Sequence, residues 1–104
     1  RLEKNNDFEI VKDKNILYLD ADKVSYPLTI RKWKKGDWFV PFGMNGKKKV
    51  SDYFSDQKFS LFEKEDTWLL CSDKDILWIV GERADNRFRI GNKTQHIITI
   101  TLED

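Results

Sequence analysis

The hydrophobic pattern in the first third of the chain is typical of β structure. Apolar runs at residues 8–11, 16–19 and 28–33 have the length of strands, and polar residues that favour turns separate them. The first two runs flank a short polar segment, so we expect them to form a hairpin. Pro27 precedes the third run, at the edge of a strand, where a missing amide donor is tolerated.

The middle of the chain turns and then becomes a loop. Residues 34–37 read as a turn because Gly36 can adopt a positive φ, and a short apolar run follows at 38–40. Proline and two glycines then punctuate residues 41–46, which therefore predict a loop.

Beyond this loop the pattern takes on a helical period. Four positions at i, i+3, i+4 and i+7 predict an amphipathic helix over residues 50–58: Val50, Tyr53, Phe54 and Gln57. Ser60 and Glu63 have the spacing of a capping box, so we expect a second short helix to begin there.

The last forty residues return to β structure. Runs at 67–72 and 76–80 flank a three-residue hairpin loop, and the short run at 87–90 reads as a further strand. Residues 95–102 alternate, which places four side chains on one face: His96, Ile98, Ile100 and Leu102. Strands, then helices, then strands predict an α+β fold in which short helices cover one side of antiparallel sheets.

Length and composition indicate one folded domain. The 104 residues suit a single domain, and fourteen aromatic side chains must supply much of its core. No run approaches the roughly 18–20 apolar residues that span a bilayer. The first residue is Arg1 rather than Met, so we expect residues 1–104 to be one domain of a longer polypeptide. Cys71, the single cysteine, excludes an intrachain disulfide, fits a reducing compartment and is expected to be a buried, inert thiol.

Positive charge is concentrated in one quarter of the chain. The net charge is only +1, yet residues 31–58 carry eight basic and three acidic side chains, which gives +5. Residues 1–30 carry −1 and residues 59–104 carry −3 by the same count. Such a distribution favours an anionic partner for the middle of the chain.

Catalytic and metal chemistry find little support. His96 and Cys71 are the only residues of their types, and no ligand pair has the spacing of a zinc site. Ser51 or Ser55 could be combined with His96, but no nucleophile-elbow motif holds either serine. We therefore expect no catalytic site, metal or cofactor within these residues.

The loop at 43–49 is the sharpest candidate for binding. Its Gly-Met-Asn-Gly-Lys segment is too short for a Walker loop, and it follows a strand rather than the helix of a KH domain. Three consecutive lysines follow at the start of the predicted helix, where free amides favour anions. A second basic group lies just upstream, and aromatic residues lie between the two: Arg31, Lys32, Lys34 and Lys35, with Trp33, Trp38, Phe39 and Phe42.

Two interpretations of these lysines remain open at this point. A phosphate backbone is a natural partner for a basic surface with interleaved aromatic rings. The alternative is a structural or protein-interaction domain whose lysines only keep it soluble. A membrane surface is less suited, because the chain contains no basic amphipathic helix of sufficient length.

Residues 25–102 carry ordered motifs that together resemble the C-terminal domain of bacterial tRNA(Ile)-lysidine synthetase. The motifs are Arg31, Gly36-Asp37, Pro41-x-Gly43, Gly46-Lys47-Lys48-Lys49, Asp56-x-Lys58, Trp68-Leu69-Leu70 and Gly81-x-Arg83-x-Asp85-x-Arg87. The resemblance implies an unusual β-sandwich of antiparallel sheets with helices, similar to a domain of the phenylalanyl-tRNA synthetase β subunit. It also implies a cytoplasmic parent enzyme that uses ATP and magnesium, in a separate catalytic domain, to attach lysine to the wobble cytidine of tRNA(Ile).

The resemblance further implies that this domain docks the acceptor stem of tRNA(Ile) and lies beside other domains of the parent. The basic positions that match are Arg31, Lys47, Lys48 and Lys58, to which charge adds Lys34 and Lys49. Arg83 and Arg87 also match and have either an RNA-binding or a structural role. The second predicted helix departs from the family, because Ser60 replaces a frequent proline and Lys64 is left as the possible phosphate contact.

Overall fold

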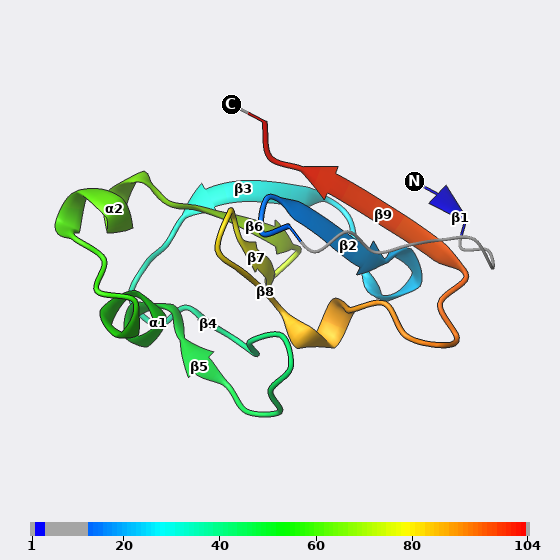
Figure 1. The fold of residues 1–104 in the computed structure, drawn as a ribbon, viewed down its shortest axis with the longest axis horizontal. Coiled ribbons are helices and arrows are strands. Elements are labelled where there is room, and N and C mark those ends of the chain that lie inside the picture. The colour runs from blue at the N-terminus through cyan, green and yellow to red at the C-terminus, as the bar shows by residue number, and fades with distance from the viewer. Residues whose placement is uncertain (1, 4–12, 104) are drawn as a thin grey trace.

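The computed structural model describes residues 2–3 and 13–103, and within them it forms antiparallel sheets with short helices at one end (Figure 1). The strands are β1 (Leu2–Glu3), β2 (Ile16–Asp20), β3 (Leu28–Lys32), β4 (Trp38–Phe39), β5 (Lys48–Lys49), β6 (Trp68–Ser72), β7 (Asp75–Ile79), β8 (Arg83–Ala84) and β9 (His96–Thr101). The helices are η1 (Ala21–Lys23), α1 (Val50–Asp56), α2 (Leu61–Asp66) and η2 (Asn86–Phe88). The α+β prediction, with antiparallel sheets and two short helices, is confirmed.

A central sheet with strand order β3-β6-β7-β8 carries both halves of the core. Its β6–β7 hairpin pairs Ser72 with Asp75, so the connecting loop has two residues rather than the predicted three. The pairing shifts between Leu70 and Cys71, where β7 holds one extra residue. Such a bulge changes which face a strand's side chains occupy, and here both Leu77 and Trp78 point to the same side of the sheet.

A second sheet covers one face of this central sheet. Its order is β1-β9-β2, with Leu17 opposite Ile100 and Leu19 opposite Ile98. The hydrophobic cluster between the two sheets consists of Leu17, Leu19, Val24, Leu70, Leu77, Trp78 and Phe88. The predicted hairpin between residues 8–11 and 16–19 has its first strand outside the described residues and stays a prediction; among the described strands, β2 pairs with β9.

The opposite face of the central sheet is covered by α1 and the β4–β5 pair. Its cluster consists of Phe39, Val50, Tyr53, Phe54, Leu69, Cys71, Ile76 and Ile79, all buried. Phe54 lies at its centre, with Trp33 edge-on at 5.4 Å and Phe59 stacked at 4.9 Å between ring centroids. The amphipathic period of the helix is thereby confirmed, although α1 ends at Asp56 and Gln57 is its exposed cap. Cys71 is buried as predicted, and burial raises the pKa of its thiol.

The region after β7 differs from its prediction. The run at 87–90 was expected to be a strand, but Asn86–Phe88 form a turn of 3-10 helix, and β8 precedes them. The reason is local: the Asp85 carboxylate accepts a hydrogen bond of 2.7 Å from the backbone amide of Arg87 and so caps the turn. Side chains of this kind offer the backbone an alternative to a sheet ladder.

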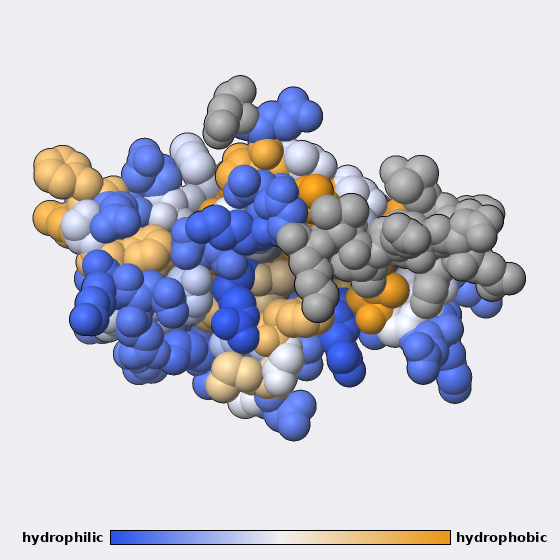
Figure 2. Space-filling model, in the orientation of Figure 1, coloured by the Kyte–Doolittle hydropathy of each residue, from blue (hydrophilic) through white to orange (hydrophobic). Residues whose placement is uncertain are grey.

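The surface divides into different regions at the helical end. Figure 2 shows hydrophilic residues gathered over α1 and hydrophobic ones at the tip of α2. Leu61 and Phe62, both on α2, are 70% and 84% exposed. Within the described residues, no helix has the length and apolar character needed to cross a membrane.

The packing predicts unequal effects for two phenylalanines that are eight residues apart. Phe54→Ala should lower the free energy of unfolding by about 3–5 kcal/mol, because it leaves a cavity under α1. Phe62→Ala should change it by less than about 0.5 kcal/mol, since this side chain is exposed. Urea denaturation of both variants measures the difference, and equal losses would contradict the assignment of the core.

Candidate nucleic-acid interface

The loop lysines lie against the turn at 34–37. Lys48 and Lys49 form β5, which pairs with β4 so that Lys49 is opposite Trp38. The amide of Val50 donates to the carbonyl oxygen of Asp37 at 2.9 Å, where α1 begins. Two segments that are ten residues apart in sequence are thus held side by side, and the turn that carries Lys34 leads directly into β4.

Arg31 and Asp37 form a two-point ion pair beneath this turn. The guanidinium Nη1 and Nη2 atoms donate to the two carboxylate oxygens of Asp37 at 2.8 and 2.9 Å. The amide of Lys34 donates to the same carboxylate at 2.8 Å, which closes the turn. Gly36 has φ +95°, the conformation predicted for it. The ion pair therefore fixes the path of the turn that carries Lys34 and Lys35.

The environment of this pair favours the charged forms of both groups. Burial alone would raise the pKa of the Asp37 carboxyl, but the hydrogen bonds from Arg31 and from the Lys34 amide outweigh it and lower the pKa. The hydrogen bond with Asp37 raises the pKa of Arg31 against a smaller opposing effect of burial. Two of the Arg31 donors are committed to Asp37 and Nη1 also reaches the Lys32 carbonyl oxygen at 3.1 Å.

Trp38 carries two cations over its ring. The Lys47 Nζ lies 4.3 Å and the Arg87 guanidinium carbon 4.6 Å from the ring centroid. Arg87 is itself bound to Asp85 through Nη2 at 2.9 Å and Nε at 3.0 Å. The Trp38 ring therefore links the loop at 43–49 to the segment around η2, because Lys47 and Arg87 both lie over it. The ion pair with Asp85 holds Arg87 in this position.

A network of hydrogen bonds holds the loop at 41–46. The buried Asp85 carboxylate accepts from the amide of Val40 at 2.9 Å. Asn86 accepts from the amide of Gly43 at 3.0 Å and donates to the carbonyl oxygen of Met44 at 3.0 Å. Arg83 donates to the Phe42 carbonyl oxygen at 2.8 Å. Residues 83–87 thus fix a loop that lies forty residues earlier in the chain.

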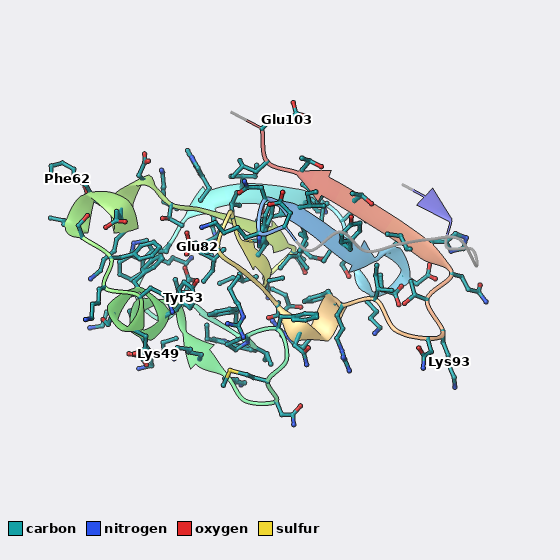
Figure 3. The ribbon with its side chains drawn as sticks, viewed as in Figure 1. Lys49, Tyr53, Phe62, Glu82, Lys93 and Glu103 are labelled. Atoms are coloured by element: carbon teal, nitrogen blue, oxygen red, sulfur yellow. The ribbon has the colours of Figure 1, made fainter. Side chains whose placement is uncertain are left out.

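α1 is held to the same region by a hydrogen bond. The Tyr53 hydroxyl donates to the Glu82 carboxylate at 3.1 Å, and Figure 3 shows the two side chains pointing toward one another. Burial and the neighbouring Glu82 charge raise the pKa of Tyr53 to about 12. Tyr53 therefore remains a neutral hydrogen-bond donor at neutral pH.

The predicted basic residues fall into two groups. Arg31, Arg87 and Lys48 are ion-paired, the last with Asp56, while Arg83 binds a backbone carbonyl oxygen. Within the described residues, the exposed lysines that lack a carboxylate partner include Lys34, Lys35, Lys47, Lys49 and Lys58, which we call the lysine face. The Lys48–Asp56 pair joins β5 to the end of α1, two residues before Lys58. Lys58 has φ +57°, which turns the chain after α1.

Sequence reasoning found the lysines but not the groups that hold them. The contacts of Asp85 and Asn86 with the loop were missed, although the Asp85-x-Arg87 spacing was noted in the motif. Lys64 is half-buried on α2 among acidic neighbours, away from the loop lysines in sequence. Among the residues described, no group of three or more His, Cys, Asp or Glu side chains could hold a metal ion.

Comparison with known proteins decides the family. The sequence model of one protein family, described as the TilS substrate C-terminal domain, matches residues 28–101, which is most of the chain. The chain belongs to this family. The match includes both ion pairs, Arg31–Asp37 and Arg87–Asp85, and all the residues of the lysine face.

Two curated relatives of the TilS family are tRNA(Ile)-lysidine synthases. The one from Parabacteroides distasonis is 63% identical over 92% of this chain, and the one from Bacteroides thetaiotaomicron is 51% identical over 88%. The matched part amounts to 22% of the length of each relative. The chain thus spans about a fifth of the length of these enzymes.

Solved structures agree with the fold of the TilS family. A crystal structure of a TilS C-terminal domain superimposes with a TM-score of 0.73 at 23% identity, over 96% of this chain and 81% of that one. An N-terminal fragment of the phenylalanyl-tRNA synthetase β subunit from Pyrococcus horikoshii gives 0.64 at 18% identity, over 81% of this chain and 26% of that one. At these identities the likeness concerns the fold, and it confirms the fold that the motifs implied.

The Arg31–Asp37 pair predicts a loss of stability that depends on pH. Asp37→Asn should lower the free energy of unfolding by about 1.5 kcal/mol at neutral pH, toward the low end for a charged hydrogen bond because part of Arg31 is exposed. The folded-state pKa of Asp37 lies below its ordinary 3.8. Its contribution is therefore complete above that value and is lost as the pH falls through the lower folded-state pKa.

Urea denaturation at several pH values measures this contribution. The difference between the wild type and the variant should be constant above about pH 5 and should shrink as the pH is lowered further through the acid range. A difference that stays constant over this range would contradict the role of the Asp37 charge. Lys93→Gln, at the far end of the molecule in Figure 3, provides a surface control.

Proposed function

We propose that this chain is the tRNA-binding domain of a longer tRNA(Ile)-lysidine synthase and that its lysine face docks the acceptor stem of tRNA(Ile). The names of the relatives support this substrate and reaction. The observation that carries the proposal is the lysine face itself, where cations without carboxylate partners lie on a turn, a loop and the end of a helix that ion pairs and hydrogen bonds hold in place. Because the supports are already ion-paired, the free cations remain available for phosphate.

The proposal divides the work between two sets of basic residues. Lys34, Lys47, Lys49 and Lys58 contact phosphate oxygens as point charges on flexible stems. Arg31, Lys48 and Arg87 position the segments that carry them, through Asp37, Asp56 and Asp85. Arg83 belongs with the positioning residues because it holds the Phe42 carbonyl oxygen.

The form of the partner follows from the chemistry of the face. Its charges are spread over a turn, a loop and a helix end, which suits the spaced phosphates of an A-form duplex better than a single anion. Proteins read double-stranded RNA mainly through its shape and backbone. The lysine face therefore binds the backbone of the acceptor stem without recognising its bases. Other parts of the enzyme recognise the nucleotide that is modified.

The reaction itself takes place outside this chain in the proposal. ATP and magnesium serve a separate catalytic domain of the cytoplasmic parent, which activates the wobble cytidine and attaches lysine. The present residues supply binding energy at a distance from the reacting base. Holding a substrate in place accelerates a reaction by reducing the entropy that remains to be lost.

The dependence of RNA binding on salt tests the proposal. In the enzyme that carries this domain, Lys47→Gln with Lys49→Gln should weaken binding to tRNA(Ile). Loss of two phosphate contacts should also reduce the slope of log affinity against log salt by about 1.8, at roughly 0.9 per contact. Filter binding or fluorescence anisotropy at several salt concentrations measures both values.

The control removes the same charge from the other end of the molecule. The double variant Lys23→Gln with Lys93→Gln changes residues near the start of β9, against which η1 packs. It should leave both the affinity for tRNA(Ile) and the salt slope unchanged. Equal effects of the two double variants would indicate a nonspecific response to net charge. No effect of the loop variant would favour the alternative, a protein-interaction domain with solubilising lysines.

A further inference from the structure

Helix α2 presents its apolar side chains to solvent. None of its residues is buried, and Leu61 and Phe62 are 70% and 84% exposed. Figure 3 shows Phe62 at the outer end of α2, pointing away from the body of the molecule. The core accounts for neither side chain, so their apolar surface is free for a partner.

The helix is nevertheless well fixed at both ends. The Ser60 hydroxyl accepts from the Glu63 amide at 3.1 Å, and the Glu63 carboxylate accepts from the Ser60 amide at 2.9 Å. The hydroxyl of Thr67 donates to the Glu63 carbonyl oxygen at 2.6 Å. These bonds hold the backbone of the short helix in one conformation before any partner binds, which reduces the entropy lost on binding.

The charges around these two side chains are acidic. Glu63, Glu65 and Asp66 are exposed on the same six-residue helix, and with Lys64 they give it a net charge of −2. Phe62 and these three carboxylates also line a shallow hollow on the surface. Residues 31–58 carry +5 by contrast. Polyanionic RNA is repelled from such a helix, whereas a protein surface with basic residues complements it.

We propose that α2 is an interdomain docking element, with Leu61 and Phe62 inserting into an apolar socket rimmed by basic residues on another domain of the same enzyme. The proposal rests on the chain being part of a longer synthase, but it does not require the lysine face to bind tRNA. The relatives offer the surface, because roughly four-fifths of their length lies outside the matched region. α2 thus sets the direction in which the lysine face points toward the tRNA.

Photo-crosslinking in the full-length enzyme tests the identity of the partner. A benzophenone amino acid in place of Phe62 should crosslink to a peptide of the same polypeptide outside residues 1–104, with lysine or arginine beside apolar residues. The control places the same benzophenone amino acid at Phe42, which is 51% exposed in the loop at 41–46. It should crosslink to added tRNA(Ile) and not to that peptide.

Several results would overturn the docking proposal. These are crosslinks from position 62 to tRNA, to a second copy of residues 1–104, or to a different protein, and the absence of any crosslink above that of an exposed position such as Glu103. If the expected crosslink from position 62 is not found, tRNA binding is still tested by the crosslink from position 42 and by the lysine variants. The two proposals can therefore fail separately.

A double variant provides a second, independent readout. Leu61→Ser with Phe62→Ser should leave the unfolding midpoint of the isolated chain unchanged, because neither side chain is buried. In the full-length enzyme it should raise the rate of limited proteolysis next to this domain several-fold and enlarge the radius of gyration. The salt slope for tRNA should stay the same. Unchanged proteolysis and size in the double variant would overturn the docking role.

Discussion

The ion pair between Arg31 and Asp37 is the interaction on which the lysine face depends. Asp37 uses its carboxylate to hold Arg31 and the Lys34 amide, and its carbonyl oxygen to receive the amide of Val50. One residue therefore joins the end of β3, the turn and the start of α1. Lysines repel one another, so bringing them together requires a framework that is stabilised independently, and this pair provides it beneath the surface.

A second carboxylate repeats the arrangement on the other side of Trp38. Asp85 is buried, pairs with Arg87 and accepts from the Val40 amide, so it ties the loop to the C-terminal half of the chain. Removing one partner of such a pair leaves a buried charge uncompensated, which costs more than the pair contributes. The domain therefore needs both carboxylates to remain paired, and the arginines opposite them have little freedom to act as phosphate ligands.

Local signals were predictable from the sequence, and contacts between distant segments were not. The helical period of α1, the capping box at Ser60 and the turn at Gly36 each depend on neighbouring residues, and the structure confirms them. The short strands β5 and β8 depend on partners elsewhere in the chain. The run at 87–90 was misread for a different, local reason: Asp85 accepts a hydrogen bond from the Arg87 amide two residues on and caps a turn, which the apolar and basic pattern of the run does not indicate. Charge counting located the lysines but could not separate free cations from paired ones.

The helical end of the domain carries two neighbouring surfaces of opposite charge. α1 and β5 carry the lysine face, while α2, only a few residues further on, carries carboxylates around exposed apolar side chains. Neither surface suits the partner of the other: RNA is repelled from α2, and a basic protein surface is repelled from the lysine loop. Phe59 stacks on Phe54 in the core and directly precedes Ser60, the cap of α2, so a domain docked at α2 lies close in the chain to Lys58 at the end of α1. Under the two proposals, the domain connects the body of the enzyme at α2 with the tRNA at the lysine face.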